Sequence, residues 1–148
     1  GELRGRACTD SGYRHGVTHR ISVLDAEHPV CAGVPASFEI TDELYLAEVF
    51  EDDVIPLLAS DATFEAEHFH SAAAAVRDGR MFSSDGWSHA PGSNLVGWVR
   101  RRGSSPICYL QCGDDPVAWA NPHFRTLLGN AVRWVASDAA RAWARGGA

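Results

Sequence analysis

The chain lacks the features that mark membrane and secreted proteins. No apolar run in its 148 residues approaches the roughly 18 residues that span a bilayer. No basic, apolar, small-residue leader opens it, so we expect no secretion signal. The four cysteines form no CxxC pair; they are Cys8, Cys31, Cys108 and Cys112. We therefore predict a reduced, cytoplasmic protein whose cysteines serve as small apolar residues.

The chain also lacks a concentrated positive charge. Its formal net charge is -6, and its arginines are scattered apart from Arg100, Arg101 and Arg102. These three precede a Gly-Ser-Ser turn and are interpreted as the solvated tip of a hairpin. Because phosphate contacts need a basic face, the sequence disfavours nucleic-acid binding. The length and the 45% apolar content fit one globular domain over 1–148.

Several catalytic motifs are absent as well. There is no G-x-S-x-G elbow, so a Ser-His-Asp triad is not indicated. There is no G-x-G-x-x-G fingerprint and no P-loop, so nucleotide binding has no motif to support it. Function must therefore be sought in smaller groups of polar residues.

The first half of the chain predicts short strands. Residues 1–18 are interpreted as a loop-like start, and 21–24 as the first strand. Residues 38–40 predict a brief strand, and Thr41 with Asp42 then a turn. A further strand is expected over 54–59, with Pro56 at an edge or a bulge.

The second half predicts a hairpin and a long helix. Residues 95–99 and 107–110 are expected to pair. Asn121 is a good N-cap, and Pro122 suits the first helical position. The apolar stripe of this helix comprises Phe124, Leu127, Leu128, Ala131, Val132 and Val135. Residues 137–148 are interpreted as a tail with a short helix, whereas 72–77 fit a strand or a helix equally well.

Two groups of acidic residues are candidates for chemistry. Asp42 and Glu43 follow a short strand, and paired carboxylates can divide acid and base roles. Adjacent residues of an extended chain point in different directions, so one carboxylate could face a pocket while the other caps a turn. The loop 111–120 carries Gln111, Asp114 and Trp119 beyond a strand end, where open α/β sheets bind ligands. The alternative is a solvated turn at Asp114 and Asp115 before Pro116.

The histidines offer a weaker metal signal. His68 and His70 share one face if they lie on a strand, and Glu65 or Glu67 could add an oxygen ligand. A divalent metal is thus one interpretation, and an exposed or hydrogen-bonded pair is the other. His28 fits a capping role in a turn before Pro29. His15 lies in a glycine-flanked segment that could line a cleft.

The segment 81–94 combines serines with Trp87 and His89. An indole beside short polar side chains is a common surface for sugar rings. The alternative is an ordinary surface loop pinned by Trp87.

Three blocks together resemble the ThuA-like, or trehalose utilisation, family. They are HPVCAGVP with FEITDELY (28–45), LVGWVRRRGSSPICYLQCGDD (95–115) and NPHFRTLLGNAVRWV (121–135). The resemblance covers about residues 19–135. It implies an α/β fold, a flavodoxin-like or class I glutamine amidotransferase-like three-layer sandwich that lacks the N-terminal β-α units. The chain would then be the C-terminal portion of the usual domain.

The resemblance also implies a link to trehalose or other disaccharides, including their keto derivatives. The catalytic candidates are Asp42, Glu43, His89 and Asp114, and the substrate-binding candidates are Trp87, Gln111 and Trp119. The family often has Gly-His where this chain has Gly113-Asp114, so a histidine role there is not carried over. The amidotransferase cysteine has no counterpart either. The expected partner is a small sugar, with neither nucleic acid nor membrane. The alternative is a non-catalytic binding or oligomerisation module with an exposed parallel edge.

Overall fold

The computed structural model describes residues 10–146 and contains one curled sheet. Its strands are β1 (Gly12–Val23), β2 (Ser37–Leu46), β3 (Ile55–Ser60), β4 (His70–Ser71), β5 (Leu95–Arg102) and β6 (Ser105–Leu110). They are ordered β2-β1-β3-β5-β6, and β4 pairs with the beginning of β1. Every pairing among these strands is antiparallel. The expected parallel edge is therefore wrong for this part of the chain.

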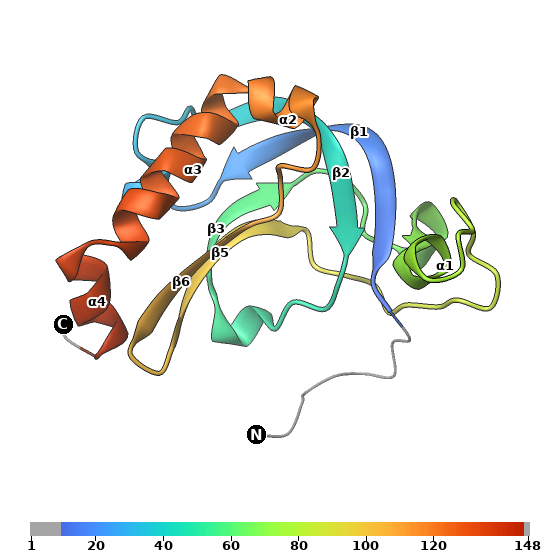
Figure 1. The fold of residues 1–148 in the computed structure, drawn as a ribbon. Helices are drawn as coiled ribbons and strands as arrows, with labels where there is room; N and C mark the ends of the chain where they lie inside the picture. The colour runs from blue at the N-terminus through green and yellow to red at the C-terminus, as the bar shows by residue number, and fades with distance from the viewer. Residues whose placement is uncertain (1–9, 147–148) are drawn as a thin grey trace.

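Helices lie on both sides of the sheet (Figure 1). They are α1 (Ala72–Val76), α2 (Pro116–Ala120), α3 (Pro122–Val135) and α4 (Asp138–Ala144), with 3-10 turns η1 (Pro29–Cys31), η2 (Glu51–Asp53) and η3 (Ala66–His68). α3 and α4 run along one side, whereas α1 lies beyond β1. Within residues 10–146, no helix has the length and apolar character to cross a membrane.

Strand β1 begins earlier than the sequence predicted. Residues 12–18 were expected to be loop, but β1 pairs with β2 from Gly12 onward. A register shift between Arg14 and Val17 and a positive φ of 62° at Gly16 interrupt the strand there. Such a bulge breaks the two-residue alternation of buried side chains, which concealed the strand. The expectation for residues 1–9 lies outside the described residues.

Strand β2 is also longer than predicted. The turn expected at Thr41 and Asp42 is wrong, because the strand continues to Leu46. One face of β2 is entirely buried and consists of Phe38, Ile40, Asp42, Leu44 and Leu46. Asp42 lies at the centre of this otherwise apolar face. Because aspartate is common in turns, its presence led the sequence analysis to predict a turn there.

Other predicted elements are confirmed. β5 and β6 form the hairpin, with Gly103 in the turn and Arg101 and Arg102 exposed at its tip. Arg100 was expected at the solvated tip as well, but it is half-buried within β5. The bulge expected at Pro56 appears as a register shift between Pro56 and Leu58. Residues 72–76 are helical, which decides between the two interpretations of that segment.

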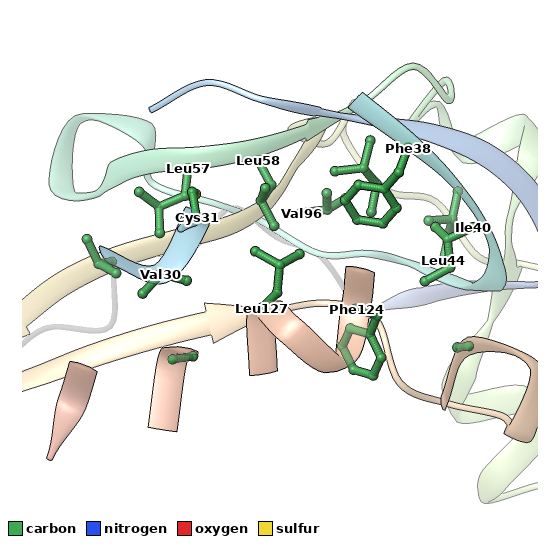
Figure 2. Packing of buried hydrophobic residues seen from close by; sticks show 14 of the residues in the cluster. Val30, Cys31, Phe38, Ile40, Leu44, Leu57, Leu58, Val96, Phe124 and Leu127 are labelled. Atoms are coloured by element: carbon green, nitrogen blue, oxygen red, sulfur yellow. The ribbon is translucent and has the colours of Figure 1, made fainter. Parts of the chain in front are cut away.

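Helix α3 packs its apolar stripe onto the sheet. Asn121 Oδ1 caps it by accepting hydrogen bonds from the backbone N–H groups of His123 (3.0 Å) and Phe124 (3.3 Å). Leu127 points towards the buried side chains of β3 and β5 (Figure 2), and Phe124 belongs to the same buried cluster. Val132 does not belong to the stripe, because it is 60% exposed, whereas Trp134, two residues later, is buried. This packing fixes the loop that precedes α3 against the sheet.

Candidate functional site

The loop after β6 passes along the edge of β2. Gln111 contacts this edge through its side-chain amide, whose Oε1 accepts a hydrogen bond from Tyr45 N (3.2 Å). Its Nε2 donates to Tyr45 O (3.3 Å). Gln111 thereby satisfies two backbone groups that an edge strand leaves unpaired. The predicted substrate-binding residue Gln111 thus braces the strand that carries the site.

Asp42 holds the next part of this loop. Its fully buried carboxylate accepts hydrogen bonds from Gly113 N (2.7 Å), Asp114 N (3.2 Å) and Glu43 N (2.8 Å). Gly113 has a φ of 124°, and a Cβ atom there would lie 3.0 Å from the Phe124 ring. A glycine is therefore needed at this position. Asp42 fixes the backbone of Asp114 from beneath.

On the other face of β2, four side chains meet. We call His15, Glu43, Tyr45 and Asp114 the proton cluster. His15 Nδ1 lies 3.1 Å from Glu43 Oε1. The Tyr45 hydroxyl contacts Glu43 Oε2 and lies 3.0 Å from Asp114 Oδ1. The Glu43 side chain is only 8% exposed, whereas His15 is 43% exposed. A buried carboxyl group is thus connected to solvent through a histidine.

The proton cluster requires a shared proton. A phenolic hydroxyl carries one hydrogen, yet Tyr45 contacts two carboxyl groups. Both contacts can be hydrogen bonds only when one carboxyl group is also protonated. Burial, together with the nearby charge of Asp114, raises the pKa of Glu43. Burial and the two carboxylates raise the pKa of Tyr45 far above its usual range, so the phenol keeps its proton.

A hollow of about 310 Å³ opens in front of these side chains. It is lined by Tyr13, His15, Glu43, Tyr45, Ala72, Ala75, Val76 and Met81. Phe82 stands beside it, with its ring 5.9 Å from that of His15. Phe82 has a positive φ of 58°, which is strained for a bulky residue, and its N–H donates to the Tyr13 hydroxyl (2.7 Å). Strained backbone held by a specific contact is typical of functional sites.

The same cluster offers a set of metal ligands. Ligand atoms of His15, Glu43 and Asp114 lie within 4.8 Å of one another, and theirs is the single such group in residues 10–146. One imidazole and two carboxylates suit a divalent transition metal. The predicted pair His68 and His70 belongs to no such group. His68 faces Glu67 Oε1 (3.5 Å) from η3, and His70 packs against Tyr13 and Phe82 from β4.

Of the residues predicted to contact a sugar ring, Trp119 lies near the proton cluster, whereas Trp87 holds its own loop in place. Trp87 donates from Nε1 to Asp10 O (3.2 Å) and packs against Gly12, as expected for a residue that pins its loop. His89 Nδ1 lies 2.6 Å from Ala90 O, and neither Trp87 nor His89 lines the hollow. Trp119 donates to Gly113 O (2.9 Å) and is 47% exposed next to the loop that carries Asp114.

Two other polar residues considered in the sequence analysis, Asp115 and His28, cap the beginnings of helices. Asp115 caps α2 by accepting from Val117 N (2.8 Å) and Ala118 N (3.1 Å), so it is a structural residue. His28 Nδ1 accepts from Val30 N (3.2 Å), which confirms its capping role. Asp114 therefore differs from Asp115, because its side chain belongs to the proton cluster.

The cysteines are unsuited to nucleophilic chemistry. Burial raises the pKa of Cys31 and of Cys108 to about 11 and that of Cys112 to about 12. A thiol attacks as its thiolate, which is scarce at neutral pH when the pKa is this high. These three residues therefore provide no amidotransferase-type nucleophile, while Cys8 lies outside the described residues.

Comparison with known proteins identifies the family of this chain. A family model described as "Trehalose utilisation" matches residues 3–135. The chain belongs to the ThuA family. No curated protein matches the sequence significantly.

A solved structure of a ThuA-like protein from Bacteroides uniformis ATCC 8492 has the same fold. The two are 21% identical, with a TM-score of 0.55, over 85% of this chain and 46% of that protein. The ThuA-family chain thus spans about half the length of this relative. The expected α/β sandwich of the class I glutamine amidotransferase-like type is confirmed.

Sequence reasoning missed the full membership of the proton cluster. The match begins at residue 3, not near His19, and so includes the strand that carries His15. Tyr45 stood two residues after Glu43, the spacing that puts both side chains on one face of a strand. This spacing could have revealed that Glu43 and Tyr45 lie side by side. It was overlooked because a turn, and not a strand, was predicted at Asp42.

Proposed function

We propose that this ThuA-family chain carries out acid/base chemistry on a small carbohydrate, a disaccharide or its keto derivative, at the proton cluster. The observation that carries the proposal is the Tyr45 hydroxyl between the carboxyl groups of Glu43 and Asp114. This arrangement holds one proton that can be given up and one carboxylate that can accept another. A protonated carboxyl group beside a carboxylate is the pair that general acid/base catalysis uses.

The roles follow from burial. Glu43 is the more buried carboxyl group, and its raised pKa makes it the proton donor. Asp114 is exposed and does not itself line the hollow, but its Oδ1 lies 3.0 Å from the Tyr45 hydroxyl, which does, so it is the candidate base at the edge of the site. Tyr45 donates a hydrogen bond to whichever carboxylate is charged. His15 lies between Glu43 and solvent and can return the proton. Asp42 is a positioning residue, since it fixes the loop and does not face the hollow.

With a keto sugar as substrate, Asp114 and Glu43 can carry out a defined chemical step. Asp114 removes the hydrogen from the carbon beside the carbonyl, and Glu43 gives its proton to the carbonyl oxygen. The product is an enediol, with the proton balance unchanged. Positioned acid and base groups of this kind contribute about 10²- to 10⁴-fold to a rate.

Isotope exchange tests the proposal. The protein is incubated in D₂O with trehalose and with its keto derivative, and both are followed by proton NMR. We expect deuterium to replace the hydrogen beside the carbonyl of the keto sugar, and Glu43→Gln to slow this exchange at least about 100-fold. Glu39→Gln, an exposed glutamate of the same strand, is the matched control. If exchange is no faster than in buffer alone and neither sugar is altered, the proposal is wrong.

We also propose that the protein acts in the cytoplasm. The cysteines at 31, 108 and 112 are free thiols, as expected in a reducing compartment such as the cytoplasm. The partner is a small sugar, and the surface charge gives no reason to add nucleic acid.

A further inference from the structure

The hollow in front of the proton cluster has two chemically different walls. One wall consists of side chains from β1 and β2 that can exchange hydrogen bonds or protons, namely His15, Glu43 and Tyr45. The opposite wall comes from α1 and the loop after it. Its side chains are Ala72, Ala75, Val76 and Met81, none of which forms strong hydrogen bonds. Tyr13 also lines the hollow, but its hydroxyl already accepts a hydrogen bond from Phe82 N (2.7 Å) and contacts Met81 Sδ (3.9 Å). The other polar groups that face a ligand all lie on the side of His15, Glu43 and Tyr45.

The apolar wall exposes surface that the core does not use. Val76 is 88% exposed, Met81 is 52% exposed and the adjacent Phe82 is 60% exposed. Three large apolar side chains close together in the chain and open to water are unusual unless something covers them. We use the name apolar wall for the two exposed lining residues Val76 and Met81 together with Phe82, which stands beside the hollow.

The wall is held in place by specific contacts. Phe82 N donates a hydrogen bond to the Tyr13 hydroxyl (2.7 Å), which in turn lies 3.9 Å from Met81 Sδ. The Phe82 ring packs edge-to-face on both His15 and His70. These contacts keep the strained Phe82 backbone where it is. The wall is a built surface beside the proton cluster.

A second sugar ring fits this wall poorly. Each hydroxyl placed against Val76 or Met81 would lose its water without gaining a partner, and an unsatisfied buried polar group is unfavourable. An apolar group there would instead remove apolar surface from water. The hollow, at about 310 Å³, lies at the small end of ligand sites. One sugar ring with a small apolar substituent suits it better than a larger oligosaccharide.

We propose that the ligand of this site is a glycoside with an apolar aglycone, an aryl or short alkyl group, which packs on the apolar wall while the sugar ring meets the proton cluster. This inference rests on the acid/base carbohydrate function proposed above, and it narrows the substrate of the same site from a disaccharide to a glycoside with a single sugar ring. It makes Val76 and Met81 specificity-determining residues.

Binding of matched probes tests the inference. Phenyl glucoside and trehalose, and the keto derivative of each, are titrated into the protein and followed by calorimetry. We expect the phenyl compounds to bind about tenfold more tightly than the disaccharides. Val76→Asn should remove most of this preference, because it places an amide on the wall. Val132→Asn is the matched control, since Val132 is an exposed valine of α3 outside the hollow.

The possible results separate the two proposals. If the disaccharides bind as tightly as the phenyl compounds, or if Val76→Asn leaves the preference unchanged, the inference is wrong while the proposed function stands. If no sugar compound binds, both are wrong. Light scattering is measured on the same samples. A dimer that dissociates in Val76→Asn but not in Val132→Asn would show that a second copy covers the wall, and would also overturn the inference.

Discussion

Asp42 and Glu43 are neighbours in the chain, but their carboxyl groups lie on opposite faces of β2. Asp42 is fully buried on the core face and accepts backbone hydrogen bonds from Gly113 and Asp114. Glu43 lies on the other face, where it contacts Tyr45 and His15. One strand therefore both fixes the loop that carries Asp114 and supplies the acid that Asp114 faces. The alternation of side chains along a strand is enough to separate the two roles.

Replacement of Asp42 should destabilise the fold. In Asp42→Asn, one carboxylate oxygen becomes an NH₂ group that faces backbone N–H donors, so at least one donor loses its partner. We expect a loss of about 2–3 kcal/mol in the free energy of unfolding, measured by urea denaturation. Glu39→Gln on the same strand should change it by less than about 0.5 kcal/mol. Equal stabilities of the two variants would contradict the role assigned to Asp42.

Glu43 should make stability depend on pH. Its folded pKa is raised above the usual value of 4.5, so the folded protein binds this proton more tightly than the unfolded chain. The resulting stabilisation is fully present below pH 4.5 and is lost as the pH rises through the raised pKa, by up to about 1.4 kcal/mol per pH unit. Glu43→Gln cannot ionise and should not show this loss. Urea denaturation of both proteins from pH 4 upward checks it, and parallel curves would count against the shifted pKa.

Replacement of Gln111 should destabilise the edge of β2. Gln111→Met keeps the length of the side chain but removes both hydrogen bonds to the backbone of Tyr45. We expect a loss of about 1–2 kcal/mol in unfolding free energy. Amide hydrogen exchange should also accelerate at Tyr45. Unchanged protection of this amide in the variant would show that Gln111 does not brace the strand.

The thiols at 31, 108 and 112 should resist alkylation. Their raised pKa values of about 11 to 12 leave little thiolate at pH 8. In a Cys8→Ser variant, iodoacetamide should modify the folded protein far more slowly than the urea-unfolded chain. Mass spectrometry counts the modified residues. Rapid modification of Cys112 in the folded state would reopen the question of a cysteine nucleophile.

The sequence predicted the local elements whose signals are self-contained. The cap at Asn121, the hairpin around Gly103 and the bulge at Pro56 all depend on a few adjacent residues. β1 was underestimated because its bulge disrupts the alternation of buried side chains. The end of β2 was mistaken for a turn because Asp42 is buried by partners far away in the chain, at Gly113 and Asp114.

The candidate site could be predicted only in part, because contacts between distant parts of the chain bring its residues together. Glu43 and Asp114 were both candidates, but nothing in the sequence joined them. The junction is the Tyr45 hydroxyl, which connects residues separated by about seventy positions. His89 and Trp87 were chosen for their chemistry, yet their loop is held elsewhere, against Asp10 and Gly12.

The central claim is that Glu43 holds a proton shared through Tyr45 with Asp114. The most direct measurement is a ¹³C NMR titration of the side-chain carboxyl groups in the wild-type protein and in Tyr45→Phe. We expect a Glu43 pKa above the usual 4.5 in the wild type and a shifted Glu43 pKa in Tyr45→Phe, because the variant lacks the hydroxyl that contacts this carboxyl group. An ordinary Glu43 pKa that is unaffected by the loss of the hydroxyl would contradict it.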